Sequence, residues 1–209
     1  METIARRTGW VIMYLLIILL VLASSRYFAP GMPDAFQPEV YLDYSVVLRV
    51  HIGAGIVAVL VGPFQFWSGF RDRHRVWHKR MGATYLTAVG FAAAGGLVMA
   101  TVSYGGLVTH IGFGLLAITW SGTAAVAYVR IRAGNWPSHR EWMIRSFSIA
   151  LAFVMLRVWM GILGALGADE LELYQTASWL CWVPNIIVAE FYIGWYRNRQ
   201  AAPTAAPAE

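Results

Sequence analysis

The sequence predicts an all-α integral membrane protein with six transmembrane helices, on three observations. The 209 residues are 58% hydrophobic and only 13% charged, whereas about a quarter of the residues in a soluble domain are charged. Six apolar runs approach or exceed the roughly 20 residues that a helix needs to cross a bilayer. The segments between these runs alternate in charge, as the loops of membrane proteins do. The net charge of +5 is therefore assigned to loops on one side of the membrane, and no nucleic-acid partner is expected.

The six runs make up a single membrane domain, residues 1–209, with the lipid bilayer as its surroundings. The expected spans are 9–25, 46–69, 80–102, 107–130, 141–166 and 176–196. The first run follows Arg6 and Arg7 and ends near Ala23-Ser24-Ser25, so it would also pass as a cleavable signal sequence. The tail, residues 200–209, contains AAPTAAPAE and is expected to be disordered by composition.

Charge in the connecting segments sets the orientation. The amino terminus, the second loop (RDRHRVWHKR), the fourth loop (RIRAGNWPSHREWMIR) and the carboxyl end (WYRNRQ) are basic. The first and fifth loops are instead acidic, with Asp34, Glu39, Asp43, Asp169, Glu170 and Glu172. Because basic loops stay in the cytoplasm, both termini are predicted to be cytoplasmic.

An internal repeat relates the second span to the fourth. HIGAGIVA begins at His51 and HIGFGLLA at His110, and each is followed by a histidine with a basic neighbour, His78-Lys79 and His139-Arg140. The pattern predicts a duplicated helix pair, so that spans two to five form a four-helix bundle. Copies of a two-span unit are related by an axis along the membrane normal. His51 is then expected to face His110 at one depth, and His78 to face His139 at the other.

Small residues follow both of the first two histidines at helical spacing. The two stripes are His51, Gly55, Ala58 and Gly62, and His110, Gly114, Ala117 and Ser121. Such stripes are common where membrane helices pack closely. They could equally clear space for a flat ligand held between imidazoles, and the sequence leaves both interpretations open.

Ionisable residues inside spans are rare and are usually paired or functional. Arg145 and Glu190 lie at similar depth from the inner surface and are expected to form an ion pair. Arg157 has no evident acidic partner in neighbouring spans, so a ligand anion such as a haem propionate would suit it. Further cations gather at the inner histidine pair: Lys79, Arg80, Arg140 and Arg145.

Two imidazoles on one haem iron leave no open coordination position, which favours electron transfer. The pairs His51/His110 and His78/His139 therefore predict a transmembrane electron-transfer protein with one or two b-type haems as iron-ligated cofactors. A cytochrome-b-type oxidoreductase activity with quinol or another redox partner, and a homodimer, are further expectations. Two alternatives stay open: a metal- or proton-handling transporter that uses the same histidines, and an accessory or structural membrane protein without a cofactor.

Four segments resemble a family of bacterial membrane proteins catalogued as domain of unknown function 2306. They are GPFQF (62–66), WHKRMGATY (77–85), GFGLLAITW (112–120) and HREWMIRSFSIALAFVMLR (139–157). Lys79 stands where the family usually has Arg, and Phe147 where Tyr is common. The resemblance implies the multi-pass architecture and a bacterial inner-membrane location, but no activity. The placing of the histidines is also similar, more loosely, to the ascorbate-reducible di-haem cytochromes b, in which each histidine pair holds one haem.

Overall fold

Long helices dominate the computed structural model, which describes residues 2–30 and 37–201. The prediction of an all-helical protein with six membrane-spanning helices is confirmed. Six segments of the described chain are long and apolar enough to cross a membrane: Thr8–Phe28, Ser45–Phe66, Arg75–Thr101, Leu107–Arg132, Trp136–Ala165 and Glu170–Arg199. The third, fifth and sixth begin a turn or more before the apolar runs, because their first turns are polar. The expected disordered tail, residues 200–209, lies almost entirely outside the described residues.

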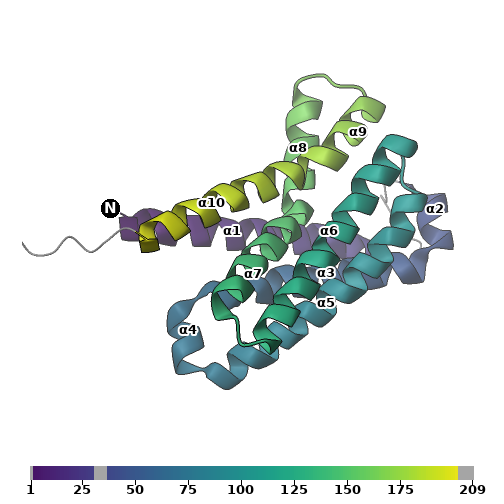
Figure 1. Ribbon diagram of the computed structural model, residues 1–209. Coiled ribbons are helices and arrows are strands. Elements are labelled where there is room, and N and C mark those ends of the chain that lie inside the picture. The colour runs from purple at the N-terminus through teal and green to yellow at the C-terminus, as the bar shows by residue number, and fades with distance from the viewer. Residues whose placement is uncertain (1, 31–36, 202–209) are drawn as a thin grey trace, which may run out of the picture.

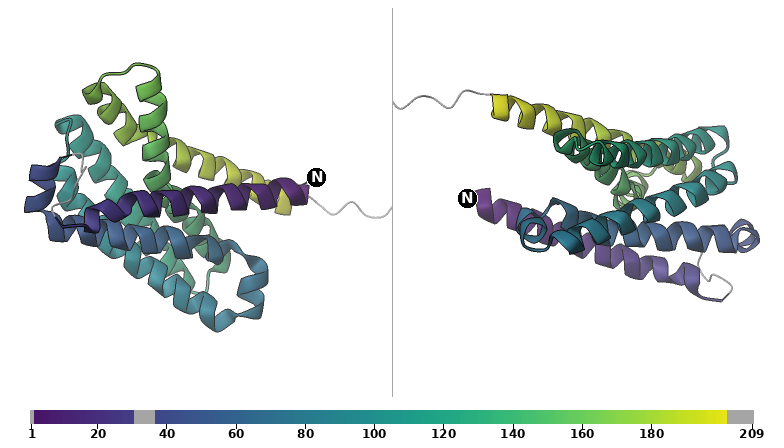
Figure 2. Two further views of the ribbon diagram at one scale, coloured as in Figure 1. Left: turned by 180° about the vertical axis from the view of Figure 1, so that it is seen from behind. Right: turned by 60° about the horizontal axis from the view of Figure 1, so that its bottom comes forward.

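Four spans pack as consecutive neighbours (Figure 1). Helix α3 (Ser45–Val61) lies along α5 (Arg75–Thr101), α5 lies along α6 (Leu107–Arg132), and α6 lies along α7 (Trp136–Ala150). Helix α1 (Glu2–Ser24) contacts α3 on one side of this bundle, and α10 (Val183–Ala201) contacts α7 on the other (Figure 2). Two short helices, α2 (Pro38–Asp43) and α4 (Ser68–Arg73), lie between spans at opposite ends. These ends are called the α2 end and the α4 end, and the charge pattern predicts that the α4 end is cytoplasmic.

The last two spans are broken within the membrane. Span five consists of α7 and α8 (Ala152–Ala165), separated at Leu151, and span six of α9 (Glu170–Leu180) and α10. Pro184 explains the second break, because proline lacks a backbone N–H and its ring crowds the preceding turn. Nothing in the sequence around Leu151 explains the first break. The two breaks meet, since Ala152 packs with Cys181 and Trp182.

Turn chemistry fixes where two of the bundle helices begin. Helix α7 starts at Trp136 because the side chain of Asn135 accepts a hydrogen bond from the Ser138 N–H, at 3.1 Å, as N-capping residues do. The turn between α5 and α6 needs glycine, since Gly105 has a φ of 96° and a Cβ there would lie 2.6 Å from the Thr109 methyl carbon.

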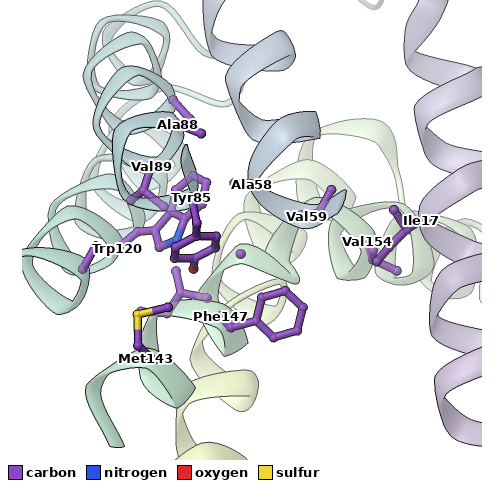
Figure 3. Packing of buried hydrophobic residues seen from close by; sticks show 14 of the residues in the cluster. Ile17, Ala58, Val59, Tyr85, Ala88, Val89, Trp120, Met143, Phe147 and Val154 are labelled. Atoms are coloured by element: carbon purple, nitrogen blue, oxygen red, sulfur yellow. The ribbon is translucent and has the colours of Figure 1, made fainter. Parts of the chain in front are cut away.

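The main hydrophobic core joins buried residues of α1, α3, α5, α6, α7 and α8 (Figure 3). Tyr85 is its largest fully buried side chain and lies among Trp120, Met143 and Phe147. The Tyr85 hydroxyl and the Ser146 hydroxyl hydrogen-bond across the bundle at 2.8 Å. This contact joins α5 to α7, which lie diagonally opposite each other, so it links the two helices through the core.

Candidate ligand cavity and histidine sites

A cavity of about 390 Å³ occupies the bundle toward the α2 end. Its walls come from α3, α5, α6, α7, α8 and α9, with further residues from α2 and from the turn after α1. Both helix breaks contribute to it, through Ala150, Ala152 and Cys181. The walls are mostly apolar, and the volume falls in the range of small-molecule and cofactor sites. Polar or charged residues also line it, among them Arg26, Tyr27, Tyr41, His51, Ser103, Arg157 and Tyr174.

His51 is held against α5 with one ring nitrogen left available. Its Nδ1–H donates a hydrogen bond to the carbonyl oxygen of Ala92 at 2.7 Å, and because a carbonyl can only accept, this bond fixes the tautomer. In the neutral ring the lone pair is therefore on Nε2, and this nitrogen has no hydrogen-bond partner among the described residues. Two glycines let the ring approach: a Cβ on Gly95 would lie 2.9 Å from the His51 Cβ, and one on Gly96 would lie 3.1 Å from Cε1.

Arg157 adds a cation to the cavity wall, and no carboxylate among the described residues pairs with it. The side chain comes from α8 and is partly buried, and its guanidinium carbon lies 5.4 Å from the ring centre of Phe153. No ion pair forms at Arg157 within the part of the chain that the structure describes. Its charge acts on His51 and on the phenols of Tyr41 and Tyr174. The cavity thus combines a free imidazole nitrogen with an uncompensated positive charge.

Tyr41 belongs to α2, outside the spans, and lines the cavity. Burial, and next the neighbouring Tyr27, raise the pKa of the Tyr41 phenol above its ordinary value, although Arg157 acts in the opposite direction. The phenol is therefore neutral at physiological pH. It hydrogen-bonds with the phenol of Tyr174 and adds no negative charge near Arg157.

His110 does not join His51 at this cavity. Its Nε2 donates to the carbonyl oxygen of Ser103 at 3.0 Å, in the turn that precedes its own helix, and His110 is absent from the described cavity walls. Of the stripe that follows it, Ala117 lines the cavity, whereas a Cβ on Gly114 would meet nothing within 4 Å. The repeat therefore sets both histidines at the start of a span but gives their side chains different partners.

His78 and His139 do lie near each other at the α4 end, close enough for their charges to interact. His139 resembles His51, since its Nδ1–H donates to a carbonyl oxygen of the neighbouring helix, that of Ala127, at 2.8 Å. In contrast, Nδ1 of His78 is buried without a hydrogen-bond partner among the described residues. Two of the four histidines, His51 and His139, are thus held as metal-ligating imidazoles usually are, by a hydrogen bond from the other nitrogen.

The cations expected around the inner pair have other contacts. Lys79 is exposed, the guanidinium carbon of Arg80 lies 5.6 Å from the Trp77 ring centre, and that of Arg140 lies 3.9 Å from the ring centre of Tyr196. Arg145 forms the predicted ion pair: its Nε and a terminal nitrogen lie 2.5 and 2.9 Å from the two carboxylate oxygens of Glu190. That prediction is confirmed.

A second ion pair was missed by the sequence analysis. Arg197 binds Glu141 with two hydrogen bonds, one of them 2.6 Å long from Nε to Oε1. The signal was present: Glu141 lies one turn before Arg145 on α7, and Arg197 lies two turns after Glu190 on α10, the helix packed against it. Because α7 and α10 run in opposite directions, Glu141 lies at the depth of Arg197 and Arg145 at the depth of Glu190. Depth alone could therefore have predicted both ion pairs.

The donor set suits a haem better than a bare metal ion. A closed zinc site needs four ligands, and within residues 2–30 and 37–201 no three His, Cys, Asp or Glu side chains gather closely enough to hold a metal ion. A haem needs only one or two axial imidazoles, apolar walls and cations for its propionates. The cavity wall includes one imidazole, that of His51, together with apolar side chains and the cations Arg26 and Arg157.

The fold defines a multi-pass membrane protein with a ligand-sized cavity inside its helix bundle. The chain belongs to the family described as "Predicted membrane protein (DUF2306)", whose model matches residues 48–193, the part that carries α3 to most of α10. No curated protein and no solved structure matches it.

Proposed function

We propose that the protein is a transmembrane electron carrier that holds a b-type haem in the cavity, with His51 as an axial ligand. The observation that carries this proposal is the state of His51. Its Nδ1–H is bonded to a backbone carbonyl, so the lone pair on Nε2 is free beside a cavity of about 390 Å³. When bound, the haem would supply reversible one-electron chemistry.

The rest of the cavity supports an anionic, largely apolar ligand. Arg157 and Arg26 line it as cations, and neither forms an ion pair within the described part of the chain. Burying a cation is costly unless an anion compensates it, so a propionate would stabilise Arg157. The protein would orient the His51 imidazole toward the iron, exclude water from the haem and bind its propionates.

A second haem at the α4 end is a further part of the proposal, with His139 and its neighbour His78 as ligands. His139 has the same Nδ1–H to carbonyl bond as His51. Quinol in the bilayer, or a redox protein, would exchange electrons with these haems. Loss of a separate spectral component in His139→Ala would test this second site.

An absorption spectrum of protein purified from haem-supplied cells tests the main proposal. The wild type should show Soret and reduced alpha bands. His51→Ala should lose the band of the cavity haem, whereas His110→Ala, whose imidazole bonds to Ser103 instead, should keep it. A colourless wild type that also takes up no added haem would overturn the proposal.

The helix breaks favour a second candidate, a transporter with its substrate site in the cavity. Discontinuous membrane helices often surround such sites, and both breaks contribute to the cavity wall. Transport requires that the cavity open alternately to both sides of the membrane. Cys181 is the only cysteine of the chain and lines the cavity, so it reports this opening.

Membrane-impermeant thiol reagents applied from each side of oriented vesicles would distinguish the two candidates. A transporter should be labelled at Cys181 from both sides, and Cys181→Ser should abolish the labelling. Labelling from the α2 side alone, or none at all, would count against transport and leave the haem site as the stronger candidate.

A further inference from the structure

A second hollow lies outside the cavity, at the α4 end of the molecule. It is an open groove, called the α4 groove here, and its described walls are Phe64, Phe70, His74, Trp77 and Met81. The walls come from η2 (Gly62–Phe66), from α4 and the residue after it, and from the first two turns of α5. The described walls of the groove and of the cavity share no residue, and none of the histidines proposed as haem ligands lines the groove.

Ring contacts hold these walls in place before anything binds. The ring centre of Phe70 lies 5.9 Å from that of Phe64 and 5.5 Å from that of His74. Trp67 stacks on Phe70 with ring centres 6.2 Å apart, and Tyr14 of α1 packs edge-on against Phe64 at 6.0 Å. Aromatic pairs at such distances stabilise each other, so a ligand would not have to order the groove as it binds.

The α4 groove crosses the boundary between the membrane and the aqueous phase. Phe64 lies at the end of the second span, and Met81 lies at the start of the third apolar run. His74 precedes that run by about two helical turns, or roughly 10 Å. Trp77, between them, is 57% exposed, and tryptophan is enriched at this boundary of membrane proteins. One end of the groove is therefore at the level of acyl chains and the other at the level of headgroups.

Unpaired cations surround the headgroup end of the groove. Residues 71–80 contain five lysines and arginines but one carboxylate, that of Asp72, which pairs with Arg71 at 3.0 Å. The guanidinium carbon of Arg80 lies 5.6 Å from the ring centre of Trp77, so this cation sits beside a wall of the groove. Four exposed cations of the segment form no ion pair within the described part of the chain: Arg73, Arg75, Lys79 and Arg80.

An apolar groove next to unpaired cations fits a phospholipid that carries a negative charge. A soluble anion would leave the aromatic walls uncovered, and a neutral lipid would leave the cations uncompensated. The cytoplasmic leaflet contains anionic lipids that attract basic segments next to a span. The charge pattern predicts that the α4 end faces this leaflet, so the lipid is at hand where the groove opens.

We propose that the α4 groove is a binding site for one anionic phospholipid. Part of an acyl chain would lie along Phe64 and Met81, and the phosphate would lie beside Arg80. Trp77 contributes to both parts, because its ring lines the groove and contacts the Arg80 guanidinium. The bound lipid would tie α4 and the first turns of α5 to the inner leaflet. The proposal goes beyond electron transfer, since it requires neither a haem nor the cavity.

Lipid binding to the full-length protein in detergent tests the site. The protein is titrated with dioleoyl phosphatidylglycerol, and native mass spectrometry gives the apparent Kd of the first lipid bound. Phosphatidylcholine with the same chains is the neutral comparison, and glycerol phosphate is the anion without chains. The wild type should bind phosphatidylglycerol about tenfold more tightly than phosphatidylcholine, as two basic side chains near an anionic headgroup would give. Glycerol phosphate at the same concentration should not displace the lipid.

Two variants separate the charge from the groove. Arg80→Gln should weaken phosphatidylglycerol binding about fivefold and leave phosphatidylcholine binding unchanged. Trp77→Ala keeps every charge but removes a wall, so it should weaken the binding of both lipids. Gel-filtration elution and far-UV circular dichroism identify folded protein, and Arg80→Gln alone decides the test if Trp77→Ala misfolds.

The carboxyl end of α10 provides matched controls. The guanidinium carbon of Arg199 lies 4.4 Å from the ring centre of Trp195, both side chains are exposed, and neither lines the groove. The charge pattern predicts the same side of the membrane for this pair. Arg199→Gln and Trp195→Ala should therefore keep the wild-type affinity for both lipids.

Equal wild-type affinity for the two lipids overturns the proposal, and so does displacement of the lipid by glycerol phosphate. An unchanged affinity for phosphatidylglycerol in a folded Arg80→Gln or Trp77→Ala variant would also overturn it. Equal losses in the α10 controls would show that any exposed arginine–tryptophan pair retains lipid, which contradicts a site at the groove. No outcome depends on haem, so failure of the proposed electron transfer leaves this test intact.

Discussion

Toward the α4 end, Arg145 and Arg197 each meet a carboxylate across the α7–α10 contact, whereas toward the α2 end Arg157 meets an aromatic ring and a cavity. The first arrangement neutralises charge inside the protein and needs nothing from outside. The second leaves a cation that only a ligand or solvent can compensate. Among these three arginines, the one without a carboxylate partner in the described chain is the one that lines the cavity.

The largest effect on stability should come from breaking a pair at the α4 end. Arg145→Ala leaves Glu190 unpaired within a span, which costs about 3 kcal/mol for a charge at membrane depth. The unfolding free energy in detergent micelles should fall by that order. The double variant Arg145→Ala/Glu190→Ala should recover much of the loss, and an equally unstable double variant would show that the pair does not act as a unit.

At the α2 end, the matching change should affect ligand binding more than folding. Arg157→Leu should weaken haem binding by about tenfold to a hundredfold, since a charge-assisted hydrogen bond contributes about 1.5–3 kcal/mol. Haem titration followed at the Soret band measures the change. Arg157→Lys keeps the charge and should bind more tightly than the leucine variant; equal binding by wild type and Arg157→Leu would remove Arg157 from the site.

The packing of His51 against α5 should be sensitive to a single methyl group added at Gly95. Gly95→Ala would bring a Cβ within 2.9 Å of the His51 Cβ and 3.2 Å of the Val47 carbonyl oxygen, and overpacking of this kind costs about 1–3 kcal/mol. Thermal unfolding and the Soret position should both change. Gly90→Ala on the same helix meets nothing within 4 Å and should be neutral or slightly stabilising; identical effects would contradict the close contact.

The smallest change should come from the buried hydroxyl pair. Tyr85→Phe removes one hydrogen bond to Ser146 and should lower the unfolding free energy by about 1 kcal/mol. Adding Ser146→Ala should cost little more, because the remaining hydroxyl has already lost its partner. A double-mutant cycle with no coupling between the two positions would mean that the bond contributes nothing to folding.

Much of the fold followed from the sequence, because span length and loop charge are local properties. The six apolar runs located all six spans, and equal depth was enough to pair Arg145 with Glu190. The break at Leu151 could not be predicted, since no proline or glycine marks it. Pro184 did mark the break between α9 and α10.

The histidine sites were predictable only in part. Periodicity places His51 and His110 at equivalent positions of a repeat, but the direction of each ring depends on a carbonyl supplied from elsewhere, Ala92 on α5 for one and Ser103 in a turn for the other. The nearness of His78 and His139 agrees with the repeat. The cavity itself was not foreseen as such, because it depends on the breaks that tilt α8 and α9 away from the bundle.

The interrupted fifth and sixth spans also bear on how the protein fits its bilayer. Each contains 30 residues, and a straight helix of that length would extend about 45 Å, against a hydrocarbon thickness of about 30 Å. Bent at its middle, such a span can tilt further from the bilayer normal in thin lipid and stand more upright in thick lipid. Lipid chain length would then adjust the angle between the two halves, and with it the width of the opening they surround.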